Sequence, residues 1–126
     1  MKKRIFVLDD ERDMTYLTQS LLTLKGFDVT CCNHPEEAIE LLEKETFDLV
    51  FVDLMMPELS GFHVVSAIRK DERHKEMPII VLSAKRLSDL ERKDVLQYNA
   101  RFVRKPISPS LLVEIVHDEL KTSEAS

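Results

Sequence analysis

The amino-acid sequence predicts an α/β fold: a parallel sheet of five strands, doubly wound, with helices packed on both of its faces. Short segments rich in valine, isoleucine and phenylalanine alternate along the chain with segments of helical period. The two middle apolar segments, LVFV and IIVL, do not alternate with polar residues, which is typical of parallel strands buried on both faces. The 126 residues, 44% of them hydrophobic, suffice for one domain with a single core.

The five strands are expected at short apolar runs that are bounded by turn or charged residues. They are residues 4–8 (RIFVL), 28–32 (DVTCC), 48–53 (DLVFVD), 78–83 (PIIVLS) and 101–104 (RFVR). In the second strand Cys31 and Cys32 are neighbours, and neighbouring side chains of a strand point to opposite faces. We therefore expect two reduced thiols rather than a disulfide.

Helical spacing of apolar residues predicts a helix after each strand. The first helix carries an apolar residue at every third or fourth position from Met14 to Leu24, and Gly26 is its C-terminal stop. The second begins at Pro35, which is favoured in a first helical turn together with the acidic residues behind it. Ser60 is the expected N-cap of the third helix.

The last two helices differ in the regularity of their apolar pattern. Residues 88–97 do not form a continuous apolar stripe, so this helix is expected to pack loosely. Ser108 or Ser110 caps the final helix. Its inner face is expected to consist of Leu112, Ile115, Val116 and Leu120. The predicted domain covers residues 1–120, and residues 121–126 (KTSEAS) are expected to be a flexible tail or the start of a linker.

Composition and charge exclude several classes of protein. The chain has no apolar run of transmembrane length, and the apolar stretch behind its basic N-terminus is too short for a signal peptide. We therefore expect a cytoplasmic protein without membrane contact. A net charge of −5 argues against direct binding of nucleic acid. Residues 85–105, however, carry seven basic and three acidic side chains, a net +4 that leaves −9 for the rest, so this segment is expected to recognise an acidic partner.

Three aspartates lie at the ends of predicted strands. Asp9 and Asp10 follow the first strand, and Asp53 ends the third. Ligands of such sheets bind beyond the carboxyl ends of the strands, where the strand order reverses. Carboxylates gathered there repel one another, and a divalent cation that prefers oxygen ligands, Mg²⁺ in particular, removes that repulsion. The alternative, that Asp9 or Asp10 caps the following helix, does not account for Asp53.

Two further strand ends carry polar side chains. Ser83 closes the fourth strand, and Lys105 follows the fifth and precedes Pro106. A hydroxyl and an ammonium beside carboxylates would suit a phosphoryl group attached to the central carboxylate. Alternatively, Ser83 is a turn residue and Lys105 is solvated. We expect a cis Lys105–Pro106 bond, because Lys105 must point inward while the chain turns sharply into the last helix.

The motifs VLDDE, VFVDLMMPELSGF, PIIVLSA and FVRKP follow one another over nearly the whole chain, and together they resemble the receiver domain of bacterial response regulators. The resemblance implies a flavodoxin-like (βα)5 fold and Asp53 as the phosphoacceptor. It also implies that Asp9, Asp10 and Asp53 hold Mg²⁺ together with the backbone carbonyl of Met55.

The resemblance further implies a switch and a set of partners. Ser83 and Lys105 would contact the phosphoryl oxygens, and Ser83 with the aromatic Phe102 would form the switch of an output face made by the fourth helix, fifth strand and fifth helix. The donor would be a sensor histidine kinase or a histidine phosphotransfer protein, and the output a downstream protein or a fused effector domain. Asn99 and Arg101 depart from the usual pattern, where a glycine and an acid are common.

Four alternatives stay open at this point. The chain is either a whole protein or an amino-terminal fragment of a larger regulator. It is expected to be a monomer or a dimer promoted by phosphorylation. A Mg²⁺-dependent phosphohydrolase would need a general acid two residues after its nucleophile, where this chain has Met55. A flavin or nucleotide binder would need a phosphate loop, and the chain has only two glycines. A degenerate receiver would lack functional residues, and here each position is filled.

The four histidines share no ligand spacing and are expected at the surface.

Overall fold

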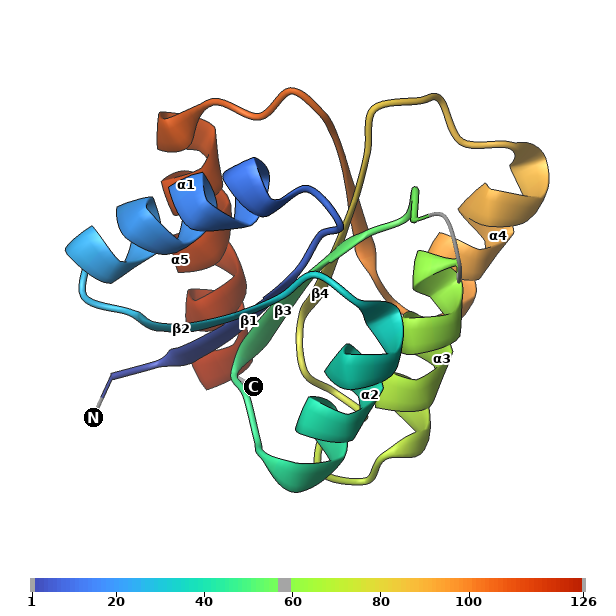
Figure 1. The fold of residues 1–126 in the computed structure, drawn as a ribbon. Coiled ribbons are helices and arrows are strands. Elements are labelled where there is room, and N and C mark those ends of the chain that lie inside the picture. Colours follow the sequence, from blue (N-terminus) through green and yellow to red (C-terminus); the bar gives the residue numbers. More distant parts are fainter. Residues whose placement is uncertain (1, 57–59, 126) are drawn as a thin grey trace.

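The computed structural model describes residues 2–56 and 60–125; residues 57–59, which belong to the motif behind Asp53, lie outside the described residues, as do residues 1 and 126. Strands and helices alternate along the chain (Figure 1). The strands are β1 (Arg4–Leu8), β2 (Asp28–Cys32), β3 (Leu49–Asp53), β4 (Ile79–Ser83) and β5 (Arg101–Arg104). The helices are α1 (Arg12–Leu24), α2 (Pro35–Lys44), α3 (Gly61–Lys70), α4 (Asp89–Gln97) and α5 (Pro109–Ala125).

The strands form one parallel sheet in the order β2-β1-β3-β4-β5, which confirms the predicted doubly wound fold. From β1 the chain winds outward to β2 on one side and to β3 on the other. The strand order therefore reverses between β1 and β3, and ligands of such sheets bind at this point. Leu8 is in register with Val52, so the next residues along the two strands, Asp9 and Asp53, reach the same edge of the sheet.

Two hydrophobic clusters explain why the middle strands are apolar throughout. Along β1, Phe6 and Leu8 belong to the cluster under α2, α3 and α4, whereas Ile5 and Val7 belong to the cluster under α1 and α5. Figure 1 shows these two groups of helices on opposite faces of the sheet. Every residue of β3 and β4 is buried. Because both faces of the sheet are covered, neither set of alternating side chains reaches water.

Serine side chains cap the starts of α3, α4 and α5, and the caps of α3 and α5 confirm the prediction. Ser60 accepts a hydrogen bond from the Phe62 N–H at the start of α3. Ser88 and Glu91 form a reciprocal capping box at the start of α4. Of the two candidates for α5, Ser108 is the cap, since its hydroxyl accepts from the Leu111 N–H at 3.2 Å.

Side-chain burial departs from the apolar spacing in α1 and from expectation at His74. The apolar stripe of α1 does not face the core over its whole length: Leu17 and Leu24 are 62% and 82% exposed, and Thr15 and Leu22 are buried instead. His74 is not at the surface but only 1% exposed. Its Nε2 accepts a hydrogen bond from the backbone N–H of Phe47, which fixes the loop before β4 against the start of β3.

The last helices bear out the expected looseness of α4 and move one boundary. In α4 only Val95 is buried, and Leu90 and Leu96 are 73% and 81% exposed. Helix α5 continues to Ala125, so residues 121–125 are helical rather than an irregular tail; the division of the chain at residue 120 stays a prediction. Among the described residues, no helix is both long and apolar enough to cross a membrane.

The first residue of α3, Gly61, allows this helix to approach the end of β3. A Cβ atom at this position would lie 2.6 Å from the backbone oxygen of Asp53 and 2.9 Å from the Cα of Leu54. Any other side chain would therefore push α3 away from the backbone that carries Asp53. Gly26 provides a contrast, because its φ of +97° requires glycine although the surrounding space is open.

We expect Gly61→Ala to lower the free energy of unfolding by about 2–3 kcal/mol, because backbone must move to admit the methyl group. It should also displace the Asp53 carboxyl resonance in an NMR spectrum. The matched control Gly26→Ala should cost roughly 1–2 kcal/mol through backbone strain alone and leave that resonance in place. Urea unfolding and NMR of both variants test this; an unmoved Asp53 signal in Gly61→Ala would contradict it.

Candidate functional site

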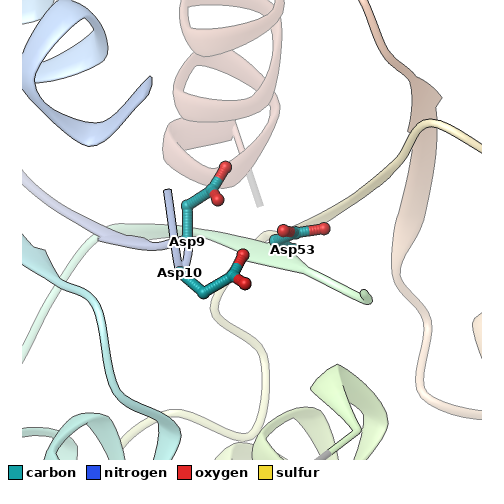
Figure 2. A group of neighbouring side chains, drawn as sticks. All are labelled: Asp9, Asp10 and Asp53. Atoms are coloured by element: carbon teal, nitrogen blue, oxygen red, sulfur yellow. The ribbon is translucent and has the colours of Figure 1, made fainter. Parts of the chain in front are cut away.

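Three carboxylates meet at the edge of the sheet where the strand order reverses. Asp9 and Asp10 directly follow β1, and Asp53 is the last residue of β3 (Figure 2). One oxygen from each carboxylate can be chosen so that all three lie within 4.8 Å of one another. Asp9 and Asp53 are each only 3% exposed, and Asp10 is half-buried. The sequence-based expectation of an acidic cluster is thus realised in the geometry.

Lys105 is the basic partner of this cluster. Its Nζ lies 2.7 Å from Oδ2 of Asp9 and 3.6 Å from Oδ2 of Asp53. Its backbone N–H donates to the carbonyl of Ser83, and the Lys105–Pro106 bond is cis, as expected from the sequence. Burial alone would lower the pKa of the Lys105 ammonium, but the hydrogen bond to Asp9 and the charges of both aspartates raise it above its usual range. Lys105 is therefore a charged group of the site and not a solvated one.

The surroundings of Asp53 disfavour its ionised form. Burial raises the pKa of its carboxyl to about 6, and repulsion from Asp9 acts in the same direction. The Met55 N–H, which donates to Oδ1 at 3.1 Å, and the Lys105 ammonium oppose this shift. Asp53 thus accepts a proton more readily than an ordinary carboxylate, and near neutral pH most of it is ionised.

Asp9 does not cap the following helix, contrary to the alternative considered from the sequence. The N-cap of α1 is Glu11, which has no side-chain capping bond. Asp9 instead accepts from the Glu11 N–H at 3.0 Å through Oδ1, which shapes the turn between β1 and α1. Within the described part of the chain, no hydrogen bond or ion pair is recorded for the Asp10 carboxylate. Its charge therefore lies in the cluster without a compensating partner.

Ser83 follows Leu82, the residue of β4 in register with Asp53, and Phe102 lies on β5 in register with Val81. Ser83 is fully buried at the end of β4, and its hydroxyl accepts from the Lys85 N–H at 3.2 Å. Among the described residues no bond donated by this hydroxyl is recorded, so its proton is free to serve an acceptor in the site. Phe102 is half-buried on β5 and packs against the cluster under α2, α3 and α4. The Met55 side chain is 51% exposed.

The sequence analysis missed one residue that supports the site. Asn33 donates from Nδ2 to the backbone carbonyl of Asp9 at 2.8 Å and to Oγ1 of Thr15 at 3.1 Å. It joins the end of β2 to the loop that carries Asp9 and Asp10. The sequence did indicate the position of this residue, because Asn33 directly follows the strand of residues 28–32 and hence lies at the same edge of the sheet.

The donor set fits a hard divalent cation. Asp9, Asp10 and Asp53 offer carboxylate oxygens, which are the ligands that Mg²⁺ prefers. Their three negative charges are opposed by the one ammonium of Lys105. A cation bound here would offset the excess negative charge. The same arrangement of ammonium, buried hydroxyl and cation ligands around Asp53 could surround an anionic group attached to its free oxygen.

Comparisons with known proteins agree on one family. A model of the response regulator receiver domain matches residues 5–117. A probable transcriptional regulator, ycf27, of Porphyridium aerugineum is 35% identical over 122 residues, covering 95% of this chain and 49% of that protein. The transcriptional regulatory protein CpxR of Escherichia coli K12 is 33% identical over 124 residues, covering 98% and 51%. The chain thus spans about half the length of these curated relatives.

Two solved structures share the fold. A CheY-like receiver domain protein from Methanospirillum hungatei JF-1 superposes with a TM-score of 0.93 at 24% identity, covering 99% of this chain and 98% of that one. The chemotaxis protein CheY4 of Vibrio cholerae gives a TM-score of 0.88 at 24% identity, covering 95% and 100%. At this level of identity the likeness shows the fold alone.

The raised pKa of Asp53 predicts how stability depends on pH. Its carboxyl is easier to protonate in the folded chain than in the unfolded one, so it destabilises the fold increasingly as pH rises from about 4 through about 6. In the presence of a chelator, Asp53→Asn should exceed the wild type in free energy of unfolding at pH 7.5, by on the order of 1–3 kcal/mol. The gap should close as pH falls towards 4. Urea unfolding across this range measures it.

The matched control is Glu114→Gln, which neutralises an exposed carboxylate of α5. This variant should show no such pH-dependent gap. If the difference in free energy of unfolding between Asp53→Asn and wild type grew as pH falls, the raised pKa of Asp53 would be contradicted.

Proposed function

The chain belongs to the response regulator receiver domain family of two-component signal transduction, and we propose that it is a phosphoacceptor that takes a phosphoryl group from a phosphohistidine onto Asp53. One observation carries the proposal. Asp53 is buried at the switch point of the sheet, 3.6 Å from the Lys105 ammonium and beside two further carboxylates. Asp9 is equally buried, but both of its oxygens accept hydrogen bonds, Oδ1 from the Glu11 N–H and Oδ2 from the Lys105 ammonium. For Asp53 the hydrogen bond from the Met55 N–H engages Oδ1, and Oδ2 lies 3.6 Å from the ammonium.

The proposed reaction is a phosphoryl transfer. An ionised oxygen of Asp53 attacks phosphorus, a P–O bond forms as the P–N bond of the phosphohistidine breaks, and the electron pair of that bond stays on the imidazole nitrogen. Lys105 stabilises negative charge on the phosphoryl oxygens, and the Ser83 hydroxyl donates to one of them. Later attack of water on phosphorus returns the Asp53 carboxylate and inorganic phosphate. Because no free substrate is turned over, the domain is not a conventional enzyme.

Asp9, Asp10 and Asp53, with the backbone carbonyl of Met55, would hold Mg²⁺ in this scheme. When bound, Mg²⁺ would supply positive charge against the phosphoryl oxygens and the clustered carboxylates. The Met55 N–H donates to Oδ1 of Asp53 at 3.1 Å, which would leave Oδ2 to attack the phosphoryl group. Lys105 and the cation would then both lie next to the negative charge of the incoming phosphoryl group.

The proposed signal passes from Ser83 to the face formed by α4, β5 and α5. Attraction of the Ser83 hydroxyl to the phosphoryl group would vacate space into which Phe102 turns. Helix α4 suits such a response, since only Val95 of its residues is buried and a shift disrupts few core contacts.

The partners follow from the same scheme. We propose a sensor histidine kinase or a histidine phosphotransfer protein as donor, acting in the cytoplasm, and a downstream protein or a fused effector domain as target. The names of the relatives favour a fused transcriptional effector, since the chain spans only about half of their length. The domain itself would bind neither nucleic acid nor membrane and would be a monomer or a dimer promoted by phosphorylation. Met55, where a phosphohydrolase of this type would carry its general acid, speaks against hydrolysis of free substrates.

Incubation with phosphoramidate and Mg²⁺ should add one phosphoryl group, observable by intact-protein mass spectrometry. Asp53→Asn should abolish the added mass and a chelator should suppress it. Asp10→Asn should slow labelling by roughly an order of magnitude or more, because a ligand of the charge-compensating cation is lost. The control Asp13→Asn, an exposed aspartate on α1, should label like wild type. Full labelling of Asp53→Asn would overturn the assignment.

A further inference from the structure

The polar groups of Asp9, on the side chain and on the backbone, all have hydrogen-bond partners. Its N–H donates to the Cys32 carbonyl at 3.2 Å, and its carboxylate oxygens accept from the Glu11 N–H and the Lys105 ammonium. Its backbone carbonyl accepts from Nδ2 of Asn33 at 2.8 Å. Asn33 is thus the partner that holds the peptide bond following Asp9.

The carboxylate of the next residue, Asp10, has no such set of partners. It is half-buried and makes no hydrogen bond or ion pair to any described residue. Its position therefore depends on the backbone, and above all on how the peptide bond between Asp9 and Asp10 is oriented. Because a peptide bond is planar, the hydrogen bond from Asn33 to its carbonyl oxygen also orients its N–H, which belongs to Asp10.

A second hydrogen bond fixes the side chain of Asn33 itself. Its Nδ2 donates to Oγ1 of Thr15 at 3.1 Å, and the Thr15 hydroxyl donates in turn to the Arg12 carbonyl at 2.9 Å. Both hydrogens of Nδ2 thus have acceptors, and Thr15 is only 4% exposed. Asparagine is a favoured N-cap and Asn33 precedes α2, yet the N-cap of that helix is His34. The Asn33 amide serves the loop between β1 and α1 instead.

We propose that Asn33 is a positioning residue of the carboxylate cluster and determines how tightly the cluster binds Mg²⁺. Through the Asp9 carbonyl it holds the Asp10 carboxylate near those of Asp9 and Asp53, so that one oxygen from each lies within 4.8 Å of the others (Figure 2). The inference rests on the proposed function, to which it adds a residue that touches neither the cation nor the phosphoryl group. Groups that orient metal ligands from behind commonly change metal affinity tenfold or more when they are removed.

The first test is a Mg²⁺ titration of the metal-free protein, followed through the backbone amide signals in NMR spectra. Asn33→Ala should raise the Kd for Mg²⁺ by roughly tenfold, because the Asp10 carboxylate is no longer held beside the other two. The matched control is Gln19→Ala. Gln19 is also half-buried, and its amide donates to the Val29 carbonyl at 3.3 Å, away from the cluster. This variant should also lose stability in urea, yet its Kd should equal that of the wild type.

The second test needs no metal. In metal-free Asn33→Ala the amide signal of Asp10 should shift and broaden, because the peptide bond that carries it is released, whereas Gln19→Ala should keep a sharp signal. Thr15→Val removes the hydroxyl that holds Asn33 and should weaken Mg²⁺ binding, and Thr15→Ser keeps a hydroxyl and should bind like wild type. An unchanged Asp10 signal in Asn33→Ala, or stronger Mg²⁺ binding by Thr15→Val than by Thr15→Ser, would overturn the proposal.

Failure of this inference and failure of the proposed function give different results. Absence of labelling at Asp53 would contradict the phosphoacceptor and leave the Mg²⁺ titration standing, since that titration involves no phosphoryl group. Equal Mg²⁺ affinity of Asn33→Ala and wild type would overturn the inference and leave the labelling standing. Asn33→Ala should label slowly at low Mg²⁺ and approach the wild-type rate at saturating Mg²⁺. A rate that stayed low at saturation would show that Asn33 acts on the transfer rather than on cation affinity, which also overturns the inference.

Discussion

The repulsion among three clustered carboxylates, opposed by one ammonium, is the interaction around which this domain is arranged. Asp9 and Asp53 are buried, and the Lys105 ammonium lies 2.7 Å from the first and 3.6 Å from the second. A charge buried without a partner costs several kcal/mol, so Lys105 is needed merely to hold the cluster in the fold. One positive charge does not balance three negative ones. The site is therefore stable enough to form and still attracts further positive charge.

Several features of the backbone serve this arrangement. The reversal of strand order between β1 and β3 brings the aspartates to one edge, and the register of Leu8 with Val52 sets their approach. Gly61 lets α3 pack against the backbone of Asp53, and Asn33 ties β2 to the loop after β1. Ser83 and Lys105 of the site lie one to three residues along the chain from Arg86 and Arg104, which line a hollow between α4 and β5.

Much of the fold and of the candidate site was predictable from the sequence, for reasons that are local. Strands buried on both faces appear as short runs that are apolar throughout, rich in β-branched residues and bounded by turn or charged residues. The ends of such strands show which polar residues meet at the sheet edge. Asp9, Asp10, Asp53 and Lys105 were found in this way. Burial within a helix was harder to predict. Leu17 and Leu24 follow helical spacing yet are exposed, because the neighbours of α1 determine which side is covered. His74 is buried with its Nε2 accepting from the Phe47 N–H, and no local pattern indicates a pairing between residues 27 positions apart.

A double-mutant cycle between Lys105 and Asp9 tests the central claim most directly. Lys105→Met, Asp9→Asn and the double variant are unfolded with urea at pH 7.5 in the presence of a chelator. We expect Lys105→Met alone to cost about 3–5 kcal/mol and far less in the Asp9→Asn background, with a coupling of about 2 kcal/mol or more. The exposed Lys75–Glu72 pair, 3.3 Å apart, provides a control cycle with a coupling of less than about 1 kcal/mol. Additive effects of Lys105→Met and Asp9→Asn would contradict the claim that this ammonium holds the carboxylate cluster in place.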